Sequence, residues 1–199
     1  MPLTKNKFVA NYFKGISDIS EKIDQKAVQS LAEAIKKIKS NKGRIFFLGV
    51  GGSAGNCSHA VNDFRKLCAI ESYSVTDNVS ELTARINDEG WDSSFSEWLK
   101  ASNFNKKDGI FVLSVGGGNE EKKVSVNIIN AIKYVEEVNS NIFGIVGRDG
   151  GYAKKNNNNV ILIPNIENSL VTPLSESFQS VIWHCLVSNP VLQIVKTKW

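Results

Sequence analysis

The sequence holds two histidine–carboxylate pairs whose spacing would put both side chains of each pair on one face of a helix. His59 and Asp63 are four residues apart, and Glu176 and His184 are eight apart. Residues at these spacings are offset by a quarter turn or less. Imidazole and carboxylate groups are the side chains that most often exchange protons with a substrate. A helical histidine can also be purely structural, and spacing alone does not bring the two helices together.

Glycine-rich turns follow two apolar segments. Gly49-Val50-Gly51-Gly52-Ser53 comes first, and Ser114 opens a second turn that continues to Asn119. Glycines let backbone N–H groups approach an anion, and a helix that starts there adds partial positive charge. Ser125 stands at the start of a predicted helix, where it can cap the helix, bind a phosphate, or do both. The first turn lacks the P-loop ending and the third glycine of the dinucleotide fingerprint, so we expect no nucleotide cofactor.

Short buried strands alternate with helices along the chain. The predicted strands cover residues 44–50, 73–75, 109–115, 141–146 and 160–163, and the predicted helices cover residues 18–40, 54–68, 95–99, 125–138 and 173–186. This order predicts βαβ units and a parallel sheet covered on both faces. We therefore expect an α/β protein of one doubly wound, three-layer domain. Ligands of such sheets bind beyond the carboxyl ends of the strands, where the glycine turns lie.

Composition narrows the class of protein. The formal net charge is +4 over 199 residues, and the basic residues are scattered, which argues against a nucleic-acid partner. No segment approaches the roughly 20 apolar residues of a membrane span, and the first residues lack the pattern of a secretory leader. Cys57, Cys68 and Cys185 lack metal-type spacing and are expected to be buried thiols in a reducing compartment. These features predict a cytoplasmic protein without a membrane partner.

Several motifs, in order, resemble the sugar isomerase (SIS) family, and within it the phosphoheptose isomerases. The resemblance extends from Phe8 to Leu192. It rests on Gly49-x-Gly51-Gly52-Ser53 followed by His59 and Asp63, on Asn87-Asp88-x-Gly90-Trp91, on Ser114 opening a glycine loop, on Gly147-x-Asp149-Gly150-Gly151, and on a last helix that reaches His184.

The resemblance implies one flavodoxin-like SIS domain over residues 1–199, with a helical segment at about 8–40 and an α/β core at about 44–192. It implies a homotetramer with sites at subunit interfaces. The implied reaction is the aldose–ketose isomerisation of sedoheptulose 7-phosphate to D-glycero-D-manno-heptose 7-phosphate, for lipopolysaccharide or capsule.

The resemblance also implies roles for single residues. The sugar phosphate would be bound by Gly51, Gly52, Ser53, Asn87, Asp88, Ser114, Gly116, Gly117 and Ser125, with the phosphate on the three serines. Asp63 would be the catalytic base, with Glu176 as the alternative, and His184 the acid. Some members bind zinc where His59, Asp63, Glu176 and His184 would lie, and such a donor set suits a tetrahedral site. Whether this chain uses zinc stays open.

The chain departs from the family pattern in the phosphate loop. Val115 and Gly116 replace hydroxyl residues, and about six residues, Asn119 to Val124, are inserted before Ser125. Lys122 or Lys123 could supply the lost contacts. The base is Asp63 where the family has glutamate, and Glu176 stands where glutamine is usual. Two alternatives therefore remain: a sugar-phosphate-binding SIS module without catalysis, and an isomerase of another sugar phosphate.

Overall fold

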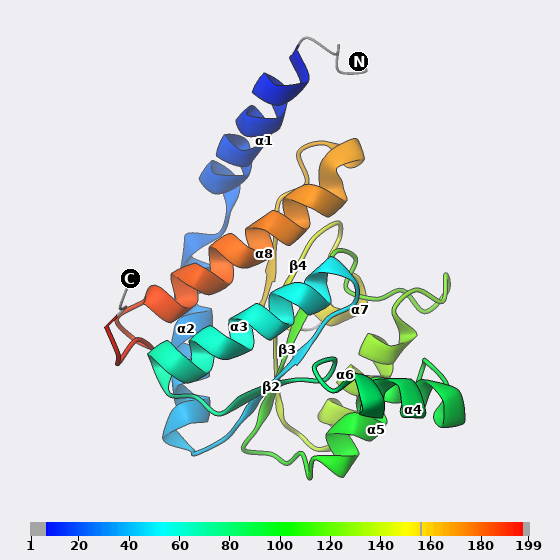
Figure 1. Ribbon diagram of the computed structural model, residues 1–199. Coiled ribbons are helices and arrows are strands. Elements are labelled where there is room, and N and C mark those ends of the chain that lie inside the picture. Colours follow the sequence, from blue (N-terminus) through cyan, green and yellow to red (C-terminus); the bar gives the residue numbers. More distant parts are fainter. Residues whose placement is uncertain (1–6, 156, 197–199) are drawn as a thin grey trace.

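Five parallel strands form the centre of the protein (Figure 1). The computed structural model describes residues 7–155 and 157–196. The strands are β1 (Ile45–Leu48), β2 (Ser72–Ser74), β3 (Gly109–Ser114), β4 (Asn141–Val146) and β5 (Val160–Leu162). Their spatial order is β2-β1-β3-β4-β5, with every pairing parallel. The chain reverses its winding direction between β1 and β3, and such a switch point is where α/β sheets bind ligands.

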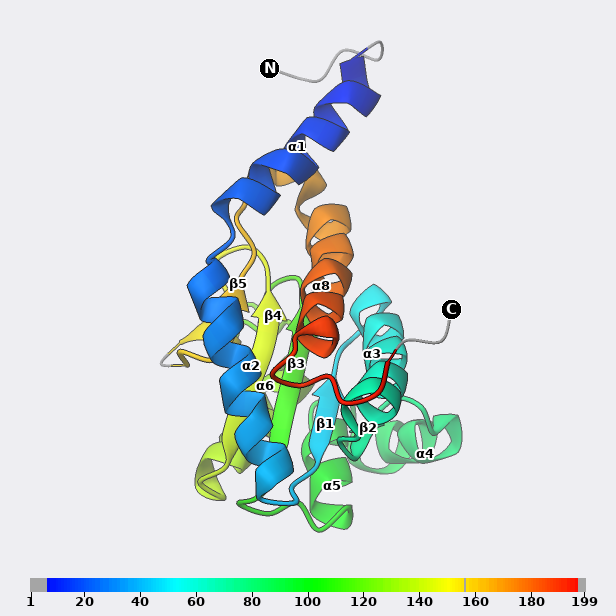
Figure 2. The same ribbon diagram turned by 90° about the vertical axis from the view of Figure 1, so that its left-hand side faces the viewer.

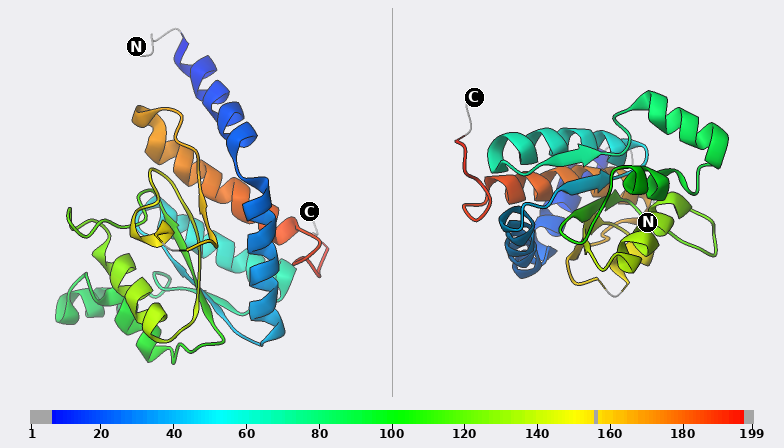
Figure 3. Two further views of the ribbon diagram at one scale, coloured as in Figure 1. Left: turned by 180° about the vertical axis from the view of Figure 1, so that it is seen from behind. Right: turned by 90° about the horizontal axis from the view of Figure 1, so that it is seen from below.

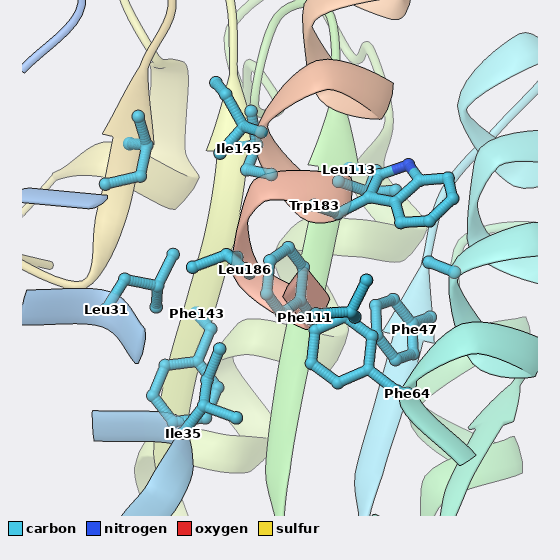
Figure 4. Close-up of a cluster of buried hydrophobic side chains, with 14 of the residues drawn as sticks. Leu31, Ile35, Phe47, Phe64, Phe111, Leu113, Phe143, Ile145, Trp183 and Leu186 are labelled. Carbon is cyan, nitrogen blue, oxygen red and sulfur yellow. The ribbon is translucent and has the colours of Figure 1, made fainter. Parts of the chain in front are cut away.

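Alternate residues of each central strand face opposite sides of the sheet and build two cores. Phe47 and Phe111 belong to one core, whereas their neighbours Phe46 and Ile110 belong to the other. Figure 4 shows the first core, where Phe47, Phe64 and Phe111 meet beside Trp183. A strand that is buried on both faces needs a continuous apolar sequence, which is why the runs at 45–48 and 109–113 predicted these strands.

Helices cover both faces of the sheet, as Figures 2 and 3 show. The first core is covered by α2 (Gln25–Ser40), α3 (Gly52–Cys68) and α8 (Val171–Ser188). The second is covered by α5 (Ser94–Ala101), α6 (Val126–Glu137) and the short α7 (Gly151–Lys154), and η2 (Asn168–Leu170) leads into α8. The expected three-layer, flavodoxin-like α/β fold is thus confirmed.

The predicted helix over 18–40 is wrong in one respect, because the chain forms two helices there. α1 (Phe8–Lys22) ends before Ile23, and α2 begins after Asp24. The Asp24 carboxylate accepts a hydrogen bond from the Ala27 N–H (2.9 Å), which is the N-cap bond that starts a new helix. The break lets α1 project away from the sheet (Figures 1 and 2).

Two helices escaped prediction, the four-residue α7 and the longer α4. α4 (Val79–Glu89) begins at Asn78, whose side chain accepts from the Glu81 N–H. None of its residues is buried, so the segment lacks the apolar period that marks a core-facing helix. The helix lies at one side of the domain, beside α5 (Figure 1).

Three further expectations can be compared with the structure. Cys57 and Cys68 are buried as expected, and burial raises the pKa of the Cys68 thiol to about 11. Cys185 is exposed, contrary to the expectation, because it lies on the outer face of α8. Among the described residues no helix is long and apolar enough to cross a membrane. The predicted domain bounds at residues 1 and 199 lie outside the described residues, and the single SIS domain stays a prediction.

Candidate functional site

A cleft of about 790 Å³ opens at the carboxyl edge of the sheet. The segments at the carboxyl ends of β1 and β3 supply Ser53, Ser114, Gly116 and Ser125, four of the residues expected to bind the sugar phosphate. Sequence reasoning gave no binding role to Arg148, Asp149, Asn165, Asn168 and Thr172, which also line the cleft. These residues lie in the cleft because neighbouring parallel strands end at the same edge of the sheet. The sequence does not reveal which strands are neighbours.

Two glycine loops meet backbone to backbone under this cleft. The Gly117 carbonyl accepts from the Ala153 N–H and the Gly118 carbonyl from the Tyr152 N–H, both at 2.9 Å. A Cβ on Gly117 would lie 1.9 Å from the Gly150 carbonyl oxygen. Gly117 does not line the cleft, so its part is to shape the cleft floor rather than to touch a ligand.

The first turns of three helices border the cleft and leave N–H groups without side-chain caps. Three lining residues mark these helices: Ser53 lies in the first turn of α3, Ser125 precedes α6, and Val171 starts α8. None of the three helices has a side-chain cap. Ser125 adopts left-handed backbone angles (φ 53°), and its hydroxyl makes no cap bond. Helix starts carry partial positive charge, so this edge of the sheet suits an anion.

Charged side chains add to this polarity. Lys122 and Arg148 line the cleft, and neither forms an ion pair among the described residues. Asp149 is the acidic lining residue, and its carboxylate accepts from the Gly151 N–H at 3.2 Å. The cleft therefore carries more positive than negative charge.

A second group of polar side chains lies further along α3 and α8. His59, Asp63 and His184 each offer a ligand atom, and these atoms lie within 4.8 Å of one another. The Oδ2 atom of Asp63 is 3.8 Å from His59 Nε2 and 3.7 Å from His184 Nε2. Asp63 is buried, whereas about half of each imidazole is exposed. The buried Trp183 ring contacts both imidazoles and forms the wall behind them.

Hydrogen bonds fix the proton arrangement of His184. Its Nδ1 atom lies 2.8 Å from the carbonyl oxygen of Ser180. A carbonyl only accepts, so Nδ1 carries the proton and Nε2 of the neutral ring presents a lone pair to Asp63. A carboxylate oxygen and an imidazole lone pair that face each other require a proton or another cation between them. The cluster can therefore exchange protons or bind a metal ion.

A polar ladder joins α3 to α8 and was missed from the sequence. Gln179 is fully buried; it donates to Ser53 Oγ (3.0 Å) and accepts from Asn56 (2.9 Å). Asn56 in turn accepts from the Ser180 hydroxyl (3.0 Å). The ladder connects the cleft residue Ser53 to the segment that holds His184. A polar face on each helix was the available signal, but pairing the two faces requires the tertiary packing.

Glu176 does not join the His59–Asp63–His184 cluster. A Cβ on Gly52 would lie 2.5 Å from its Oε2 atom, so the carboxylate lies against the first residue of α3. Glu176 and His184 are two helical turns apart, about 12 Å along α8. The expected four-residue metal set is therefore wrong for the described chain, which brings three of its members together.

Four other expected binding residues lie outside the cleft. Asn87 and Asp88 are exposed on α4 and hydrogen-bond to each other. Gly51 has a positive φ of 63°, as the tight turn into α3 requires, and Gly52 accommodates Glu176. Neither glycine lines the cleft, and both shape the start of α3.

Curated relatives come from several organisms. No family model matches the chain. The phosphoheptose isomerase of Helicobacter pylori (strain P12) is 25% identical over 174 residues, 81% of this chain and 85% of that protein. Phosphoheptose isomerase 1 of Campylobacter jejuni subsp. jejuni serotype O:2 is 27% identical over 175 residues, 85% of this chain and 83% of that protein.

Solved structures have the same fold. The phosphoheptose isomerase GmhA from Neisseria gonorrhoeae has a TM-score of 0.79 at 24% identity and covers 93% of this chain and 98% of its own. The sugar isomerase domain of an RpiR transcription factor from Sphaerobacter thermophilus has a TM-score of 0.59 at 13% identity, over 92% of this chain and 86% of that one.

The chain has the fold of SIS-type sugar isomerases, as the sequence motifs predicted. Several of the curated relatives that it resembles are phosphoheptose isomerases.

Proposed function

We propose that this protein is an aldose–ketose isomerase that converts sedoheptulose 7-phosphate to D-glycero-D-manno-heptose 7-phosphate. The observation that carries the proposal is the cluster of His59, Asp63 and His184, an acid–base set on the two helices whose first turns border an anion-binding cleft. The names of the curated relatives support the same reaction. We further propose that the protein works in the cytoplasm and supplies heptose for lipopolysaccharide or capsule.

The reaction needs one base and one acid on the same sugar. The base removes a proton from C1 of the ketose while the acid protonates the C2 oxygen, which gives a 1,2-enediol. Return of a proton to C2 and loss of one from the C1 hydroxyl give the aldose. Asp63 is the proposed base, with Glu176 as the alternative, and His184 is the proposed acid. The Ser180 carbonyl holds the His184 ring, so its Nε2 is the atom that moves the proton.

The two halves of this site lie far apart along α3 and α8. Ser53 and Asp63 are ten residues apart on α3, about 15 Å along the helix, and Thr172 and His184 are about 18 Å apart on α8. An extended seven-carbon sugar phosphate reaches roughly 10 Å from C1 to phosphorus, by ordinary bond lengths. The proposed enzyme is therefore a homo-oligomer, with a tetramer expected, in which the cluster of one subunit faces the cleft of another.

Exposed apolar residues support this assembly. Phe8, Val9 and Phe13 are exposed on α1, which projects from the domain (Figure 2). Light scattering of the purified protein is expected to give a multiple of the 21.9 kDa chain mass. Phe13→Glu is expected to shift the protein toward monomer and to reduce turnover in parallel. A fully active monomer would contradict the shared site.

Zinc binding is an alternative role for the same three side chains, because Asp63 and His184 could not exchange protons through atoms that ligate a metal ion. Two imidazoles and a carboxylate, with a fourth position left open, are the donor set of catalytic zinc sites, and His59, Asp63 and His184 provide it. Bound zinc would polarise the oxygens of the sugar. If the cluster holds zinc, elemental analysis finds about one zinc per chain, and His59→Gln lowers that content more than tenfold. Full turnover in chelator, in protein without zinc, would exclude a metal role.

The reaction itself is tested in deuterated water. Purified protein is incubated with sedoheptulose 7-phosphate and followed by NMR, and the manno-heptose 7-phosphate is expected to appear with deuterium at C2. Deuterium at that position reports an enediol that exchanges its proton with solvent. Binding of the sugar phosphate without product would instead support an SIS module that binds and does not catalyse. Turnover of a different sugar phosphate alone would support the other alternative.

A further inference from the structure

The segment inserted before α6 is a small, well-fixed hairpin at the mouth of the cleft. Asn119 and Val124 exchange both backbone hydrogen bonds (2.9 and 3.0 Å), and the Asn119 side chain accepts from the Lys122 N–H (2.8 Å). Glu120 forms an ion pair with Lys133 of α6 (2.6 Å). The hairpin is thus tied both to itself and to α6, which fixes the course of its backbone.

The two lysines of this hairpin have different surroundings. Lys122 lines the cleft together with Ser125 and Gly116, whereas its neighbour Lys123, in the left-handed conformation (φ 50°), does not. Glu120, an acidic residue of the same hairpin, forms an ion pair with Lys133. Lys122 thus lines the cleft and forms no ion pair among the described residues.

Arg148 is the second cation of the cleft and comes from the adjacent strand end. It follows β4, and its Cδ atom would lie 3.6 Å from a Cβ on Gly116, so the side chain extends along the glycine loop that follows β3. β3 and β4 are paired neighbours. Lys122 and Arg148 thus reach the same cleft from two adjacent loops, and Val115 and Gly116, which offer no hydroxyl group, also line it.

We propose that Lys122 and Arg148 form a cationic clamp that binds the phosphate of the substrate, so that recognition in this chain depends on charge more than on hydroxyl donors. The inference rests on the proposed function for the identity of the substrate, and it extends that function by naming the residues that select a dianionic phosphate. Ammonium and guanidinium groups make short charge-assisted bonds to phosphate oxygens, and exposed charge pairs weaken as salt increases.

Binding of inorganic phosphate tests the clamp without requiring turnover. Isothermal titration is compared for the intact protein, Lys122→Gln, Arg148→Gln and the matched control Lys123→Gln, which loses the same charge one residue away. Lys122→Gln and Arg148→Gln are each expected to weaken phosphate binding about 10-fold or more, whereas Lys123→Gln changes it less than 2-fold. Lys122→Arg is expected to restore most of the affinity.

Kinetics with sedoheptulose 7-phosphate separate the clamp from the proposed function. The clamp predicts that Lys122→Gln raises KM with little change in kcat, and that the loss shrinks as salt is raised. Equal phosphate affinities for Lys122→Gln and Lys123→Gln would overturn the clamp even in a fully active isomerase. Phosphate binding that depends on Lys122, in a protein that does not isomerise the sugar, would support the clamp and reject the proposed function.

Discussion

Asp63→Asn is expected to lower kcat for isomerisation by about 10²–10⁴-fold, the range typical of a lost general base. The amide keeps the shape of the side chain but cannot take a proton from carbon. Asn62 donates to Asp63 at 2.8 Å and both imidazoles lie near its second oxygen, so an isosteric replacement preserves the packing around it. Single-turnover rates with sedoheptulose 7-phosphate measure the effect, while phosphate binding should remain as in the unchanged protein.

Two companion variants separate the roles within the cluster. Glu176→Gln is expected to retain most activity if Asp63 is the base. The Glu176 side chain, on α8, packs against the first residue of α3 and does not lie beside the two imidazoles. His59→Gln leaves Asp63 and His184 in place and removes one proposed zinc ligand. The turnover of this variant is therefore compared with its zinc content. Near-normal turnover of Asp63→Asn together with an inactive Glu176→Gln would transfer the role of base to Glu176.

Gly117→Ala is expected to lower the free energy of unfolding by at least about 2–4 kcal/mol. Its φ of 66° costs an alanine about 1–2 kcal/mol, and the added Cβ would lie 1.9 Å from the Gly150 carbonyl oxygen. Because the obstacle is backbone, relief requires the two glycine loops to separate. Urea unfolding at one fixed protomer concentration measures the loss, since assembly makes stability depend on concentration.

Gly116→Ala is the matched control for this prediction. Gly116 has no positive φ, and a Cβ there would make an ordinary contact, 3.6 Å from Arg148 Cδ. Its stability should therefore change by less than about 1 kcal/mol. If both variants lose a similar free energy of unfolding, the close approach at Gly117 is not the cause of the loss.

The parts of the fold that could be predicted from the sequence are the central strands of the sheet, which are buried on both faces. The runs around Phe47 and Phe111 are apolar on both faces, and no other arrangement of a short segment explains that pattern as simply. α4 could not be found in this way, because a helix without buried residues has no apolar period to reveal. The break at Asp24 was visible as an N-cap residue, but the apolar period on both sides of it concealed the change of direction.

The candidate site was predictable only within each helix. His59 and Asp63 share a face by spacing alone, but the approach of His184 depends on how α8 packs against α3. The same spacing argument was wrong for Glu176, since two helical turns place it near the other end of α8. Lys122 was a candidate together with Lys123, whereas Arg148 carried no local signal, because its place in the cleft arises from the order of strands in the sheet.

The ladder between α3 and α8 has a consequence for the alignment of these two helices. Two apolar faces can slide past each other by a full turn of about 5.4 Å and still bury similar area. Here a slide would leave Gln179, Asn56 and Ser53 with unpaired amide and hydroxyl groups in a buried interface, which is costly. The polar pairs therefore select a single alignment. The position of His184 opposite Asp63 is thus set by residues that never touch the substrate.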